Sequence, residues 1–188
     1  MFSSPVSARA LCLYASLLTL SVPAGAADGE AIIQKGGANP AAMPCMSCHG
    51  VDGKGMAAGG FPRLAGLPEA YIAKQLADFK AGRRENPLMQ PIAQALGDGE
   101  AAAVAKAYAS QPKVSIKAGP VERPKEGSGA WLALRGAWER NIPECTLCHG
   151  PAGVGVGDVF PPLAGQSAEY IEAQLRAWRG TPAQLSGQ

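Results

Sequence analysis

Two copies of a Cys-x-x-Cys-His motif constrain this chain more than any other feature. They read Cys45-Met46-Ser47-Cys48-His49 and Cys145-Thr146-Leu147-Cys148-His149. Four of the five cysteines lie in these motifs, and the fifth, Cys12, lies in the predicted signal peptide. Four cysteines in an exported protein would ordinarily indicate a disulfide framework, but that does not explain a histidine after each pair. A four-cysteine zinc site places its pairs roughly 15–20 residues apart, whereas these lie a hundred apart. A thioredoxin-like redox pair needs a βαβ setting, which neither motif has.

The same spacing is the signature of covalent haem attachment. Two thiols three residues apart, on one turn of backbone, reach the two vinyl groups of one porphyrin, and the histidine that follows meets the iron. We therefore predict two covalently bound haem c groups, haem one and haem two. The thioether residues are Cys45, Cys48, Cys145 and Cys148, and the iron ligands beside them are His49 and His149.

The motifs lie within a longer internal repeat, which we call copy one and copy two. Phe61-Pro62-Arg63-Leu64-Ala65-Gly66 recurs as Phe160-Pro161-Pro162-Leu163-Ala164-Gly165, and Tyr71-Ile72-Ala73-Lys74-Gln75-Leu76 recurs as Tyr170-Ile171-Glu172-Ala173-Gln174-Leu175. The offset is 100 at the cysteines and 99 afterwards, so the glycine-rich loop of copy two is one residue shorter. This self-similarity predicts a duplicated domain.

The first residues predict export. Arg9 supplies the charge of a short n-region, residues 11–22 form an apolar run, and Ala24-Gly25-Ala26 is a small-x-small cleavage site. The run is shorter than the ~20 residues of a spanning helix. We therefore expect a signal peptide over 1–26, a periplasmic location and no spanning helix.

The remaining chain predicts an all-α fold without strands. Helices are expected over 29–38, 68–81, 89–96, 100–110 and 130–140, with Asp98 capping the fourth. On the last helix Trp131, Leu134 and Trp138 form an apolar stripe for packing. Proline and glycine mark a linker, so the predicted boundaries are 27–111 for domain 1, 112–129 for the linker and 130–188 for domain 2. With 17% charged residues and a net charge of +2, nothing suggests a nucleic-acid partner.

These residues resemble the small all-α class I cytochromes c, and among them the periplasmic dihaem cytochromes of the c4 type, over nearly the whole exported chain. The resemblance implies two tandem class I domains, with His49 and His149 as proximal ligands. It also implies that a P-x-L-x-G loop passes beneath each histidine, so that the carbonyl of Pro62 or Pro161 accepts the ring N–H. Such bonds orient the ring and tune the iron.

Met89 is the predicted distal ligand of haem one. The sequence has two histidines, both already assigned, so bis-histidine ligation within this chain is excluded. Met43, Met46 and Met56 lie too close to the attachment motif, whereas Met89 has enough chain before it to reach the opposite face. Histidine/methionine ligation raises the reduction potential relative to bis-histidine and closes the iron to substrates.

Copy two departs from this pattern where its distal ligand should be. The counterpart of Met89 falls at about Gln188, and the two closing helices of copy one have no equivalent. We expect a truncated reading of a longer gene. The alternative is a five-coordinate haem two, which would allow catalysis or gas sensing.

The expected function is single-electron transfer between respiratory or dehydrogenase partners, by an electron carrier rather than an enzyme. The alternative is a cytochrome subunit of a flavin or quinone dehydrogenase complex. Redox proteins are the expected partners in both cases, and peripheral association with a membrane respiratory complex is compatible with either.

Overall fold

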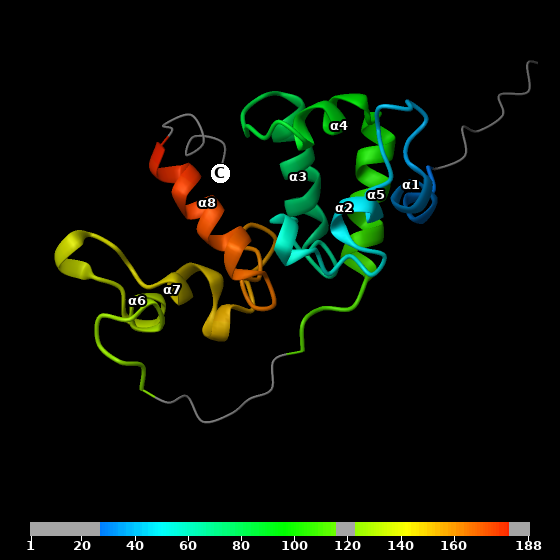
Figure 1. Ribbon diagram of the computed structural model, residues 1–188. Coiled ribbons are helices and arrows are strands. Elements are labelled where there is room, and N and C mark those ends of the chain that lie inside the picture. Colours follow the sequence, from blue (N-terminus) through cyan, green and yellow to red (C-terminus); the bar gives the residue numbers. More distant parts are fainter. Residues whose placement is uncertain (1–26, 116–122, 181–188) are drawn as a thin grey trace, which may run out of the picture.

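The computed structural model describes residues 27–115 and 123–180, and over these ranges the chain is helical (Figure 1). The only β-structure among these residues is three isolated bridges, which agrees with the predicted all-α fold. The predicted signal peptide, part of the linker and the tail that holds Gln188 lie outside the described residues. Copy one contains α1 (Gly29–Lys35), α2 (Met46–His49), α3 (Glu69–Lys80), α4 (Met89–Ala95) and α5 (Asp98–Ser110). Copy two contains α6 (Gly129–Arg135), α7 (Cys145–His149) and α8 (Ala168–Gly180).

The first helix of each copy is shorter than predicted. α1 ends at Gly36, where φ is 91°, and α6 ends at Gly136, where φ is 69°. A Cβ at either position would lie 2.5 Å from a carbonyl oxygen of the returning chain, so only glycine permits the turn. Trp138 consequently sits in a separate 3-10 turn, Trp138–Arg140, and the predicted stripe of Trp131, Leu134 and Trp138 on one helix is wrong.

The start of α5 also differs from the prediction. The N-cap is Gly97, and the side chain of Glu100 reaches back to accept the Gly97 N–H at 2.9 Å. Asp98 is not the cap. Its carboxylate pairs with Lys80 of α3 at 2.7 Å. α3 and α4 begin and end within one residue of their predicted limits.

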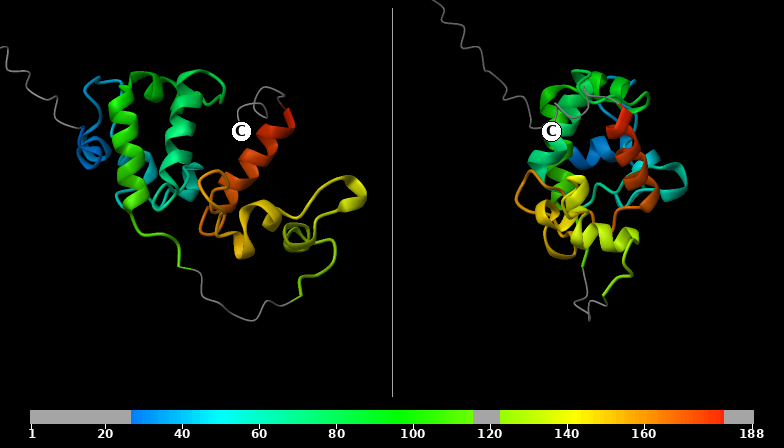
Figure 2. Two further views of the ribbon diagram at one scale, coloured as in Figure 1. Left: turned by 180° about the vertical axis from the view of Figure 1, so that it is seen from behind. Right: turned by 90° about the vertical axis from the view of Figure 1, so that its left-hand side faces the viewer.

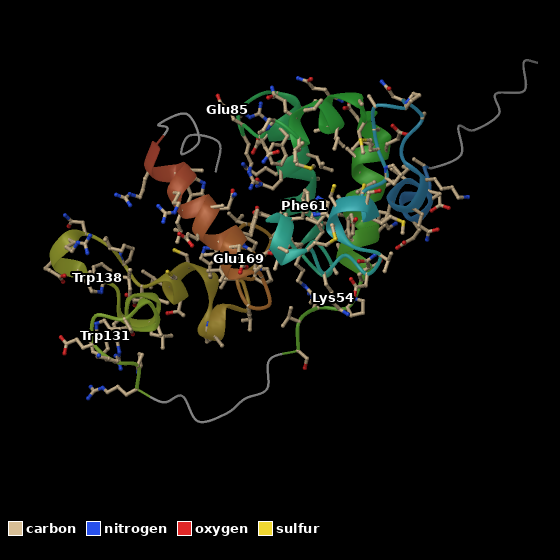
Figure 3. All side chains as sticks on the ribbon, in the orientation of Figure 1. Lys54, Phe61, Glu85, Trp131, Trp138 and Glu169 are labelled. Atoms are coloured by element: carbon tan, nitrogen blue, oxygen red, sulfur yellow. The ribbon has the colours of Figure 1, made fainter. Side chains whose placement is uncertain are left out.

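Copy one has a core of its own. α5 packs against α1 and α3, and α4 packs against α3. Among the described residues, every buried hydrophobic side chain belongs to copy one, including Ile32, Ile33, Leu76, Phe79, Val104 and Tyr108. Copy two instead contacts copy one through α8, which lies against the 3-10 turn Ala57–Gly59 of copy one (Figures 1 and 2). Trp131 and Trp138 lie on the side of copy two away from copy one (Figure 3).

The two copies are joined by hydrogen bonds from two arginines of copy one. Arg84 donates to Tyr170 Oη at 2.8 Å and to Gln174 Oε1 at 2.6 Å, both on α8. The backbone of Arg63 pairs with the side chain of Gln166. These contacts fix how the two P-x-L-x-G loops face each other.

Candidate haem-binding sites

Each Cys-x-x-Cys-His motif forms a single helical turn. In copy one, the His49 N–H donates to the Cys45 carbonyl at 2.9 Å, so Cys45 and Cys48 project from the same turn. In copy two, α7 begins at Cys145 and ends at His149. All four cysteines in the described part of the chain are free, and none of them forms a disulfide bond there.

Both histidine rings are held by the proline carbonyls that the resemblance implied. His49 Nδ1 donates to the Pro62 oxygen at 2.9 Å, and His149 Nδ1 donates to the Pro161 oxygen at 2.8 Å. A carbonyl can only accept, so Nδ1 carries the proton and the Nε2 lone pair is left for a metal. Burial lowers the pKa of His49, and the hydrogen bond to Pro62 opposes that shift only in part. A buried neutral imidazole is the form that binds iron.

The same backbone bonds hold the proline loop in both copies. The Gly53 carbonyl accepts the N–H groups of Leu64 and Ala65, and the Gly153 carbonyl accepts those of Leu163 and Ala164, all at 2.8–3.0 Å. A glycine is required at the end of each loop because the first residues of the linker pass against it. Gly66 lies against Lys113 with φ 73°, and Gly165 lies against Val114 with φ 75°.

The predicted difference in loop length is confined to one place. Met56 bridges to Phe61 in copy one, whereas Val156 bridges to Phe160 in copy two, so the loops between them are residues 57–60 and 157–159. Each phenylalanine ring lies edge-on to the histidine of its own copy. The distance between the two ring centroids is 6.5 Å for Phe61 and 6.1 Å for Phe160. The shorter loop therefore keeps the edge-on contact between phenylalanine and histidine, although His149 is less buried than His49.

Met89, the predicted distal ligand of haem one, is partly buried in copy one. It begins α4, where its N–H donates to the Asn86 side chain at 2.9 Å. Met89 and Cys45 are both partly buried against the same core cluster. Met43 and Met56, in contrast, are 52% and 41% exposed. The role of Met89 as the distal ligand stays a prediction.

The chemistry of the donor set fits a covalently attached haem. Burial raises the pKa of the Cys45 thiol to about 11, so the thiol is neutral and is not a ready thiolate ligand for a metal ion. In the described part of the chain, no group of three or more histidine, cysteine or acidic side chains could hold a metal ion. The four-cysteine zinc site therefore has no structural basis.

Comparison with known proteins agrees with this geometry. The family model described as Cytochrome c matches residues 26–115. The reduced cytochrome c4 from Pseudomonas stutzeri has a solved structure that is similar at a TM-score of 0.62 and 34% identity, covering 80% of this chain and 88% of that one. A thiosulfate dehydrogenase electron acceptor from Stutzerimonas stutzeri (strain A1501) is 62% identical over 86% of this chain and 75% of its own length. The chain belongs to the cytochrome c4 family of dihaem cytochromes.

As a member of this family, the chain carries two covalent c haems and is an electron carrier that works with redox partners, not a catalytic enzyme. A second similar solved structure is thiosulfate dehydrogenase (TsdBA) from Marichromatium purpuratum, with a TM-score of 0.68 and 42% identity over 81% of this chain. This chain spans only 32% of the length of that one. None of the described helices is long and apolar enough to cross a membrane.

Sequence reasoning missed three residues whose hydrogen bonds join the copies, namely Arg63 through its backbone and Arg84 and Gln166 through their side chains. One signal was present in the repeat, where Arg63 of copy one aligns with Pro162 of copy two. The other two residues gave no signal, because a polar side chain on a helix or loop ordinarily faces solvent.

Proposed function

We propose that this chain accepts electrons one at a time from a thiosulfate dehydrogenase and passes them on in the periplasm. The observation that carries the proposal is the 62% identity with the thiosulfate dehydrogenase electron acceptor of Stutzerimonas stutzeri over 86% of the chain. The Marichromatium structure supports it, because a protein named thiosulfate dehydrogenase contains a region similar to both copies of this chain. The periplasmic location rests on the predicted signal peptide, which lies outside the described residues.

The proposal assigns a role to each site residue. Cys45 and Cys48 anchor haem one, and Cys145 and Cys148 anchor haem two. His49 and His149 present Nε2 to the iron because the carbonyls of Pro62 and Pro161 hold Nδ1. Bound haem iron supplies the one-electron chemistry. With haem bound, Met89 would close the distal face of haem one, which would favour electron transfer over substrate binding.

The donor can be tested with the purified dihaem protein. Under anaerobic conditions, the oxidised protein is mixed with thiosulfate and a thiosulfate dehydrogenase, and haem reduction is followed by stopped-flow absorbance. We expect reduction whose rate saturates with the concentration of this protein, and none without the enzyme. Reduction no faster than that of an unrelated c-type cytochrome would contradict the proposal. Faster reduction by a flavin or quinone dehydrogenase would favour the alternative donor.

The ligand assignment has its own test. Replacing Met89 with alanine removes the thioether, so the weak sulfur-to-iron absorption band should disappear. The potential of one haem should fall by about 100 mV, well within the roughly 0.8 V range that axial ligands span. The exposed Met56 provides a matched control, since Met56→Ala should leave the band and both potentials unchanged. An intact band in Met89→Ala would show that another residue is the ligand.

A further inference from the structure

The peptide group between Pro62 and Arg63 is hydrogen-bonded on both sides. Its carbonyl accepts the His49 Nδ1–H at 2.9 Å, and its N–H donates to the Gln166 side-chain oxygen at 2.9 Å. Gln166 belongs to copy two, and its Nε2 donates back to the Arg63 carbonyl at 3.1 Å. The Gln166 side chain of copy two is therefore hydrogen-bonded to the segment whose carbonyl orients His49 of copy one.

We propose that Gln166 is a positioning residue for haem one, which lowers the reduction potential of that haem when copy two docks onto copy one. The inference rests on the assignment of His49 to haem one made above. It concerns the control of that haem across the domain interface, and it does not depend on which enzyme is the donor.

The sign follows from the direction of the hydrogen-bond chain. When the Arg63 N–H is bound by an oxygen, the peptide is polarised and its carbonyl becomes a stronger acceptor, as in other hydrogen-bonded chains. A stronger bond from His49 Nδ1–H to Pro62 gives the imidazole more anionic character and makes it a more basic ligand. A more basic ligand favours ferric over ferrous iron, so the potential falls.

The rest of the loop is fixed independently of copy two. Arg63 is buried, and its guanidinium donates to the Ala65 carbonyl at 3.0 Å and to the Pro112 carbonyl at 2.7 Å. These bonds lie within copy one and the first linker residue. Loss of Gln166 would therefore leave the loop in place and remove both the acceptor for the Arg63 N–H and the donor to the Arg63 carbonyl. A cavity of about 150 Å³, lined by Arg63, Pro162 and Gln166, lies beside the pair.

Docking of the two copies can affect the potential of haem one through this peptide, but not the potential of haem two. In copy two the corresponding peptide joins Pro161 to Pro162, and the second proline has no N–H to donate. The carbonyl of Pro161 still accepts from His149 at 2.8 Å, but nothing can polarise that peptide from its nitrogen side. Docking should therefore leave the potential of haem two unchanged through this route.

Thermodynamic linkage makes the effect reciprocal. If docking favours ferric haem one by some factor, then ferric haem one favours docking by the same factor. Reduction of haem one should thus weaken the hydrogen bonds between Gln166 and Arg63. The oxidation state of haem one would then change how tightly the two copies dock.

The test compares two glutamines of copy two that each contact an arginine of copy one. In Gln166→Leu we expect the reduction equilibrium of haem one to shift about threefold toward ferrous, or roughly 28 mV at 59 mV per tenfold. The reduction potential of haem two should not change. The control is Gln174→Leu, which removes an interdomain bond to Arg84 but touches neither proline loop. Spectroelectrochemistry of the dihaem protein gives both potentials, and the Met89→Ala background identifies haem one.

A second variant separates tuning from loosened docking. Gln166→Glu keeps an oxygen for the Arg63 N–H and adds negative charge, so the potential of haem one should fall instead of rising. Shifts of opposite sign in the two variants support the proposal. Shifts of the same sign, no shift in Gln166→Leu, or an equal shift in Gln174→Leu would overturn it. Failure of reduction by thiosulfate dehydrogenase would count against the proposed donor and leave these potentials unaffected.

Discussion

Copy one and copy two place the same residues in different surroundings. Leu76 is 8% exposed on α3, and its counterpart Leu175 is 53% exposed on α8. Ile32 on α1 is 7% exposed, and its counterpart Leu132 on α6 is 37% exposed. In copy one α5 covers both α1 and α3, whereas the described part of copy two contains no helix in that position.

The histidine geometry, in contrast, is the same in both copies. The bonds from histidine to proline differ by 0.1 Å, at 2.9 and 2.8 Å, and the same glycine carbonyl holds each loop. The proximal side of each haem site is therefore built from local backbone bonds and does not depend on the closing helices. Those helices supply the buried apolar surface, which is the main source of domain stability.

The largest expected difference between the copies concerns the matched leucines. Leu76→Ala removes a buried side chain and should lower the free energy of unfolding of copy one by about 2–5 kcal/mol. Leu175→Ala removes a half-exposed one and should cost copy two less than about 1 kcal/mol. Denaturant unfolding of the dihaem protein can separate the two, because all three tryptophans belong to copy two and report on it alone. Equal costs would mean that copy two has a core that the comparison misses.

The next test uses two equivalent glycines with opposite expected signs. A Cβ on Gly29 would collide with the Ala103 backbone where α1 crosses α5, so Gly29→Ala should destabilise copy one by about 1–3 kcal/mol. A Cβ on Gly129 would meet nothing within 4 Å, so Gly129→Ala should stabilise copy two by about 0.5 kcal/mol. Thermal unfolding of each variant checks the pair. Destabilisation by both would show that α6 also packs closely against another segment.

The smallest effect concerns the pH dependence of copy one. The Glu100 carboxylate on α5 accepts the Ala38 N–H at 2.7 Å as well as the Gly97 N–H, and these bonds lower the pKa of Glu100 from its usual 4.5. Because this pKa is lower in the folded protein, the contribution of the Glu100 carboxylate to stability is complete at pH values above its usual pKa. The contribution is lost as the pH falls through the pKa of the folded state. Glu100→Gln should therefore cost about 0.5 kcal/mol at pH 7, discounted for solvent exposure.

That cost should shrink when unfolding is measured at successively lower pH below 4.5. The conservative Glu69→Gln on α3, which has no such bonds to this turn, is the control. If the stability cost of Glu100→Gln did not change with pH, the cost would not come from the loss of the carboxylate charge.

The sequence predicted the repeated elements well because their signals are local. The motif spacing, Pro68 before α3 and the proline loops all act through neighbouring residues. The C-terminal ends of α1 and α6 could not be predicted, since Gly36 and Gly136 stop those helices only because the chain returns beside them. The role of Gln166 could not be predicted either, because it depends on a residue 103 positions away in the sequence.

The one-residue difference between the glycine-rich loops has a practical meaning for the engineering of the chain. The two copies differ in length at the loop tip, between Met56 and Phe61 in copy one, and the bonds at the base of the loop are the same in both. A Cβ added at Gly60, in this tip, would meet nothing within 4 Å. The tip is thus a place where new sequence, such as an affinity tag or an electrode anchor, can be inserted close to a haem while the ring that holds the iron stays in position.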